Sequence, residues 1–81
     1  MNRDIIADAR KKYPRGTILE LTKDMEDPYS PKTAGSKFRV DFIDDGGNIH
    51  GVWLLPASGS LCLILGVDQF IVVKEVQDDD I

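Results

Sequence analysis

The sequence FRVDFIDDGGNIHGVW, residues 38–53, predicts a β-hairpin. Phe38, Val40 and Phe42 alternate with polar residues, which is typical of a strand that buries one of its faces. The run DDGGN at 44–48 contains residues that tolerate the positive φ angles of a chain reversal. These two local signals place an antiparallel strand pair at the centre of the fold.

Further elements are predicted on both sides of the hairpin. Asn2 is a suitable N-cap, and Pro14 disfavours helical geometry at the residue before it, so a helix is expected at about 3–13. The chain is therefore predicted to be mainly β, with one N-terminal helix and a closed, five-stranded antiparallel sheet. The remaining strands are predicted from β-rich segments at 16–22, 60–64 and 70–76. The expected divisions are the helix at 1–15, the barrel domain at 16–76 and an acidic tail at 77–81.

Length, charge and cysteine content limit the class of protein. A chain of 81 residues is one small domain, and its ten Lys and Arg against fourteen Asp and Glu give a net charge of −4. Because the sequence contains no apolar run long enough to cross a bilayer and no export leader, no membrane partner is expected. The single cysteine, Cys62, cannot form an internal disulfide. These features predict a cytoplasmic location.

Few residues are suited to catalysis or metal binding. One histidine, His50, and one cysteine cannot supply the four ligands of a structural zinc site, and the carboxylates lack the spacing of a calcium loop. No serine, threonine or cysteine lies in a recognisable nucleophile motif. We therefore expect no enzymatic activity, no catalytic residues, no metal and no cofactor. Cys62 is interpreted as a core or sheet residue and His50 as a surface or edge residue.

A spaced pattern extends over about residues 16–73, with the elements G-T-x-L-x-L, M-x-D-P-Y, D-D-x-G-x-I-H, W and L-x-L-I-x-G-x-D-x-F. It resembles a small bacterial domain family of unknown function that is frequent in phages and other mobile elements. The resemblance implies a Src-homology-3-like barrel and a mobile-element context, and it implies no established activity. The N-terminal helix and the acidic tail lie outside it. Phe38-Arg39 and the segment 54–57 depart from the family pattern, which weakens any inference of a shared binding surface.

The first functional hypothesis is a non-enzymatic protein-binding module. Acidic loops on a rigid barrel can bind the arginines and lysines with which a basic nucleic-acid-binding protein holds phosphates. With the context that the resemblance implies, this favours an acidic inhibitor of a host defence nuclease, of the anti-CRISPR type. The expected partner contacts are Asp24, Glu26, Asp27, Tyr29, Asp44, Asp45, Trp53, Leu54 and Leu55.

The alternative hypothesis is a nucleic-acid-associated small barrel that uses its basic N-terminal helix. The net negative charge disfavours direct binding of a phosphate backbone. Leu54 and Leu55 also provide more apolar surface than a turn needs, so the chain is expected to be a monomer or a weak dimer. The nucleic-acid contacts under this alternative are Arg3, Arg10, Lys11, Lys12, Arg15, Lys37 and Arg39.

Overall fold

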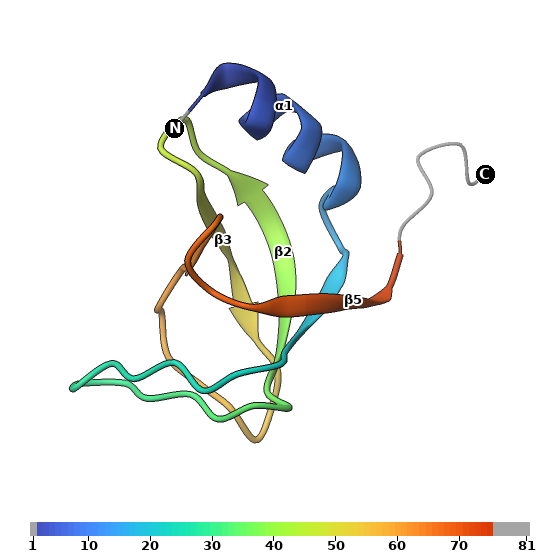
Figure 1. The fold of residues 1–81 in the computed structure, drawn as a ribbon. Helices are drawn as coiled ribbons and strands as arrows, with labels where there is room; N and C mark the ends of the chain where they lie inside the picture. Colours follow the sequence, from blue (N-terminus) through green and yellow to red (C-terminus); the bar gives the residue numbers. More distant parts are fainter. Residues whose placement is uncertain (1, 76–81) are drawn as a thin grey trace.

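The protein has one helix and one curved antiparallel sheet (Figure 1). The computed structural model describes residues 2–75, so the acidic tail at 77–81 and the last residue of the predicted fifth strand lie outside the described residues. The mainly β fold with an N-terminal helix and five antiparallel strands is confirmed. The elements are α1 (Arg3–Lys12), β1 (Ile18–Leu21), β2 (Lys37–Ile43), β3 (Asn48–Trp53), β4 (Leu63–Ile64) and β5 (Phe70–Lys74).

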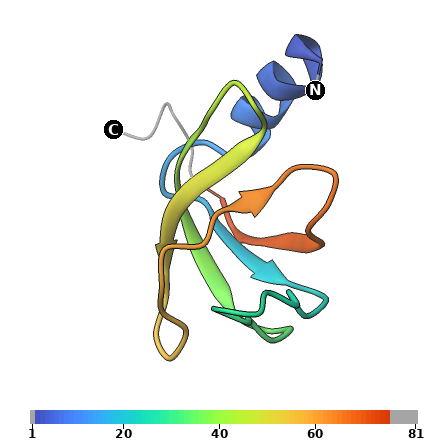
Figure 2. The same cartoon turned by 90° about the vertical axis from the view of Figure 1, so that its left-hand side faces the viewer.

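The sheet is curved but open, so a barrel describes it only approximately. Its strand order is β4-β3-β2-β1-β5, and within residues 2–75 no ladder joins β4 to β5. Figure 2 shows these two edge strands approaching each other without pairing along their length. Of the strand predicted at 60–64, only Leu63 and Ile64 pair with β3, and the carbonyl of Leu61 accepts the indole N–H of Trp53.

The core lies between the concave face of the sheet and α1. Its fully buried side chains include Leu19 of β1, Phe38 and Val40 of β2, Ile49 of β3 and Leu63 of β4. These five residues lie on the buried faces of their strands. In a strand, successive side chains point to opposite faces, so apolar residues at alternate positions can all face the core. No helix of residues 2–75 is long and apolar enough to span a membrane.

A β-bulge changes the alternation predicted for β2. The register against β3 shifts between Val40 and Phe42, so Ile43 takes the buried position and Phe42 turns outward. The prediction that Phe42 lies on the buried face is therefore wrong. The exposed ring stacks on the imidazole of His50, with 4.4 Å between centroids and 6° between planes.

Helix α1 begins and ends as predicted, within one residue. The side chain of Asn2 accepts the backbone N–H of Asp4 at 2.6 Å, and the helix ends at Lys12, before Pro14. Ile6 and Ala9 are buried against the sheet, while the guanidinium of Arg10 donates to the carbonyl oxygen of Ile43 at 2.8 and 3.0 Å. The helix is thereby attached to the end of β2 where the chain turns into β3.

The sheet consequently has two different ends. The helix end contains α1 and the turn 44–47, and the loop end contains the connections 22–36 and 54–62 (Figures 1 and 2). β2 links the two ends, and its seven residues span roughly 23 Å at about 3.3 Å per residue. The tips of the two ends therefore lie far apart, although His50 on β3 contacts both Asp44 at the helix end and Cys62 in the second connection.

Candidate functional site

The connection 22–36 at the loop end is held in shape by its own acidic residues. Met25 and Lys32 form an isolated antiparallel bridge with backbone bonds of 2.8 and 3.2 Å. The carboxylate of Asp24 accepts the N–H of Ala34 at 2.7 Å, and the carboxylate of Asp27 accepts two N–H groups just after Pro28, at 2.8 and 2.9 Å. These contacts make the connection an ordered hairpin-like arm.

Two large side chains extend from the loop end into solvent. Tyr29, at the tip of the arm, is 95% exposed, and Leu55, in the second connection, is 89% exposed. Leu54, beside it, is half-buried. Both exposed residues belong to the predicted partner-contact set, and they are the least covered large hydrophobic residues of the described chain.

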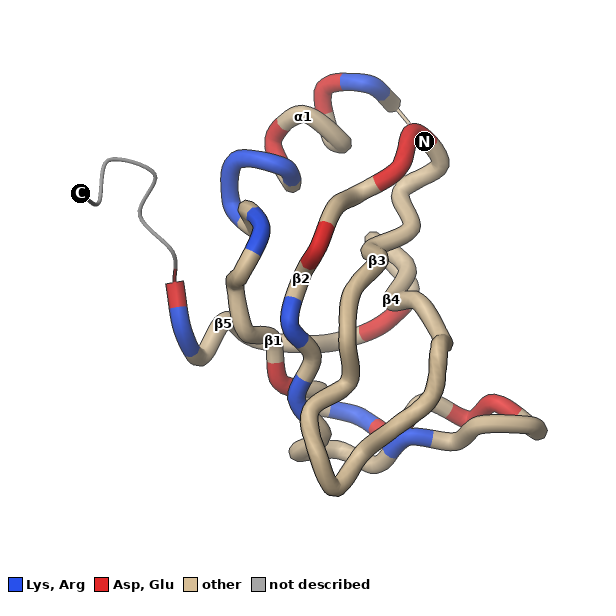
Figure 3. Tube along the Cα trace, turned by 180° about the vertical axis from the view of Figure 1, so that it is seen from behind, with Lys and Arg blue, Asp and Glu red and all other residues tan. Residues whose placement is uncertain are grey.

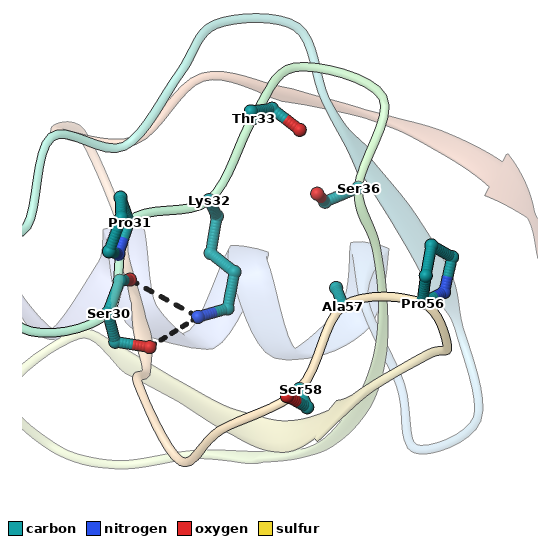
Figure 4. Close-up of a pocket in the computed structure, with 8 residues that line it drawn as sticks. All are labelled: Ser30, Pro31, Lys32, Thr33, Ser36, Pro56, Ala57 and Ser58. Carbon is teal, nitrogen blue, oxygen red and sulfur yellow. Dashed lines mark hydrogen bonds between the residues drawn. The ribbon is translucent and has the colours of Figure 1, made fainter.

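A groove of about 420 Å³ lies between the two connections (Figure 4). Ser30, Lys32 and Ser36 are among the residues that line it from the arm, and Pro56 and Ser58 line it from the other side. A second groove of about 300 Å³ continues past Ser36 to Leu55. The lining combines hydroxyl groups with proline rings, a surface that can accept both polar and apolar groups of a peptide.

Lys32 forms the buried floor of this groove, although sequence analysis did not select it. The residue is 4% exposed, and its ammonium donates to the hydroxyl and carbonyl oxygens of Ser30 at 2.5 and 3.2 Å. The same nitrogen lies 5.3 Å from the centroid of the Trp53 ring. Within residues 2–75 no carboxylate forms an ion pair with it, so the charge is stabilised by dipoles and by the aromatic face.

Trp53, expected from the sequence to contact a partner, lies in the core of the structure. It is 4% exposed and packs edge-to-face on Phe38, with 4.9 Å between ring centroids. Its indole N–H donates to the carbonyl of Leu61 at 2.8 Å. The residue supports the loop end from beneath, because it contacts Lys32 on one side and the second connection on the other.

Asp44 and Asp45 lie at the helix end, so the structure does not bring the five predicted acidic contacts together (Figure 3). The carboxylate of Asp44 accepts the N–H groups of Gly46 and Asn48 and contacts the ring of His50. These bonds, the His50 contact foremost, hold the pKa of Asp44 well below its usual range. Asp45 forms an ion pair of 3.0 Å with Arg10.

Most of the alternative nucleic-acid contacts are paired with acids. Arg10 pairs with Asp45, and the other ion pairs are Lys12–Asp8 at 3.1 Å, Arg15–Asp41 at 2.9 Å and Lys37–Glu20 at 3.5 Å. Arg3, Lys11 and Arg39 are exposed and form no ion pair within residues 2–75. Figure 3 shows acidic residues along both the helix and β2, with the basic residues Arg10, Lys11 and Lys12 grouped at the end of the helix.

A line of three polar side chains was also missed by sequence analysis. The Nε2 atom of His50 lies 2.8 Å from Oδ2 of Asp44, and its Nδ1 atom lies 3.4 Å from Sγ of Cys62. The hairpin pairing of 38–53 could have placed Asp44 near His50. Cys62 could not have been placed, because its position depends on the long connection that precedes the two-residue β4.

Comparison with known proteins gives one family. The model of the family described as "Domain of unknown function (DUF4314)" matches residues 2–73. The matched segment includes α1, whereas the resemblance drawn from the sequence left the helix outside. No curated protein and no solved structure matches the chain.

Proposed function

The chain belongs to DUF4314, a family of domains of unknown function, and from this premise and the geometry of the loop end we propose that it is a protein-binding module. The observation that carries the proposal is the exposure of two large side chains at the loop end: Tyr29, next in the chain to the groove residue Ser30, and Leu55, which lines the second groove. Tyrosine is one of the residue types enriched among the anchors of protein interfaces, and an exposed leucine beside it adds apolar surface that a partner can cover.

The arm is suited to binding because it is already ordered. Hydrogen bonds to Asp24 and Asp27 and the bridge between Met25 and Lys32 fix the backbone on both sides of Tyr29. A partner would therefore lose less affinity to the ordering of this loop than it would with a flexible one.

In its finer form the proposal makes the chain an acidic inhibitor from a phage or mobile element. Its partner would be a basic nucleic-acid-binding host protein, such as a defence nuclease of the CRISPR type. The acidic residues of the arm support this form. Glu26 forms no hydrogen bond or ion pair within residues 2–75, and Asp24 and Asp27 each use only Oδ1 in the bonds described above. The net charge of −4 favours encounter with a basic surface.

We expect the Tyr29→Ala/Leu55→Ala double variant to bind its partner about 100-fold more weakly, because a tyrosine anchor typically contributes about 2 kcal/mol and the leucine less, together about the 2.7 kcal/mol of a 100-fold change. Titration calorimetry against the partner, identified by cross-linking in the native host, measures this. The matched control is Ile5→Ala, which removes a 54%-exposed side chain at the helix end and should change affinity less than about twofold.

Two results would contradict the proposal or its finer form. Weaker binding by Ile5→Ala with normal binding by the double variant would move the interface to the helix end. Association that is insensitive to salt and to Glu26→Gln would reject the acidic inhibitor while leaving the anchors in place. A shift of labelled DNA at low salt would instead support the nucleic-acid alternative.

A further inference from the structure

Asp44, His50 and Cys62 combine the three parts of an activated nucleophile. His50 contacts the carboxylate of Asp44 through Nε2 at 2.8 Å and the thiol of Cys62 through Nδ1 at 3.4 Å. When Nε2 donates its hydrogen to the carboxylate, Nδ1 of a neutral imidazole is the acceptor, and it faces the thiol. We propose that Cys62 is a nucleophilic thiol with His50 as its base, and that it reacts with small, positively charged disulfides.

The imidazole is held in this orientation by contacts from strand β2 and from the turn 44–47. The ring of Phe42 stacks on it in parallel, at 4.4 Å between centroids. Asp44 is fixed in turn by the backbone N–H groups of Gly46 and Asn48, at 3.0 and 2.9 Å. Asp44 is therefore a positioning residue, which sets the ring orientation and stabilises the imidazolium when the base is protonated.

A cavity beside the thiol gives it a ligand site. Cys62 lines a hollow of about 230 Å³ together with three carboxylate residues, Glu26, Asp27 and Asp68, and apolar residues that include Leu61. The volume admits a ligand of a few heavy atoms. Because the described residues that line the hollow include three acidic ones and no basic one, it favours a cationic ligand over an anionic one.

The thiol needs its base because it is protonated in the resting protein. Burial first, and the nearby charge of Asp44 second, raise the pKa of the Cys62 thiol. In the reaction, Nδ1 of His50 takes the thiol proton while the sulfur of Cys62 attacks one sulfur of the disulfide. The S–S bond of the ligand breaks, a mixed disulfide forms on Cys62, and the leaving thiolate receives the proton from His50. The ligand disulfide is the only oxidant required.

The test compares two disulfides of similar size and opposite charge, cystamine and 3,3′-dithiodipropionate. Formation of the mixed disulfide on the full chain is followed by intact-mass spectrometry at neutral pH and low salt. We expect cystamine to react about tenfold faster than the anionic disulfide, and Glu26→Gln to reduce that preference. His50→Ala should lower the cystamine rate about tenfold or more, since a positioned base contributes at least that much.

Added imidazole separates a chemical role from a structural one. It should restore the rate of His50→Ala, whereas Asp44→Asn, in which the base is present but misdirected, should be slow and should not recover. If His50→Ala fails to fold, His50→Gln keeps the side-chain volume and replaces it in the rate comparison. Equal cystamine rates in the wild type and the His50 variant, or faster reaction with the anionic disulfide, would overturn the proposal.

Discussion

Gly51→Ala is expected to lower the free energy of unfolding by about 3 kcal/mol or more, because a Cβ atom at this position of β3 has no room. It would overlap the carbonyl oxygen of Arg39 on the neighbouring strand and would lie 2.8 Å from Cε2 of the buried Phe38. Neither the strand backbone nor the core ring can move without breaking the β2–β3 pairing. For a domain of this size, the melting temperature should fall by more than about 12 °C, measured by circular dichroism.

Gly46→Ala is the matched control, since it makes the same chemical change two residues outside β3. The added Cβ would meet only side-chain atoms, Asp44 Oδ1 at 3.4 Å and Asn48 Nδ2 at 3.5 Å, and these separations are ordinary contacts. Its melting temperature should stay within about 4 °C of the wild type, because surface substitutions usually change stability by about 0.5 kcal/mol or less. Equal losses in the two variants would mean that β2 and β3 do not pack as described.

Trp53→Ala is the second change with a large expected effect, a loss of about 3–5 kcal/mol. It opens a cavity against Phe38, and it removes both the N–H donor to the Leu61 carbonyl and the aromatic face beneath the buried Lys32 ammonium. Denaturation in urea measures the loss.

Trp53→Phe separates these contributions. It keeps an aromatic ring against Phe38 and Lys32 and removes the indole N–H, so it should cost clearly less than Trp53→Ala. If both variants lost less than about 0.5 kcal/mol, Trp53 would not be part of the core.

The hairpin at 38–53 was predictable because its signals are local. Alternating apolar residues and a turn rich in Gly, Asp and Asn act within a few positions of one another. The outward turn of Phe42 was not predictable, because the bulge after Val40 arises from how β2 pairs with β3. The same limit applies to closure of the barrel, since β4 has only two residues and no ladder joins it to β5 within residues 2–75.

The candidate site was predictable only in part. Tyr29 between two prolines and Leu55 beside another proline were expected to contact a partner, and both are exposed in the structure. Trp53 was assigned to the same surface because its partners, Lys32 and the Leu61 carbonyl, come from distant segments that the sequence does not place. The sequence analysis assigned the acidic residues at 24–27 and at 44–45 to one partner surface. In the structure they lie near opposite ends of β2.

Amide hydrogen exchange of the protein with and without its bound partner tests the central claim most directly. If the loop end is the binding surface, the partner should protect the amides of 24–36 and 54–62 and leave those of α1 and the turn 44–47 unchanged. Protection of α1 and the turn 44–47, with none in the two connections, would contradict the account.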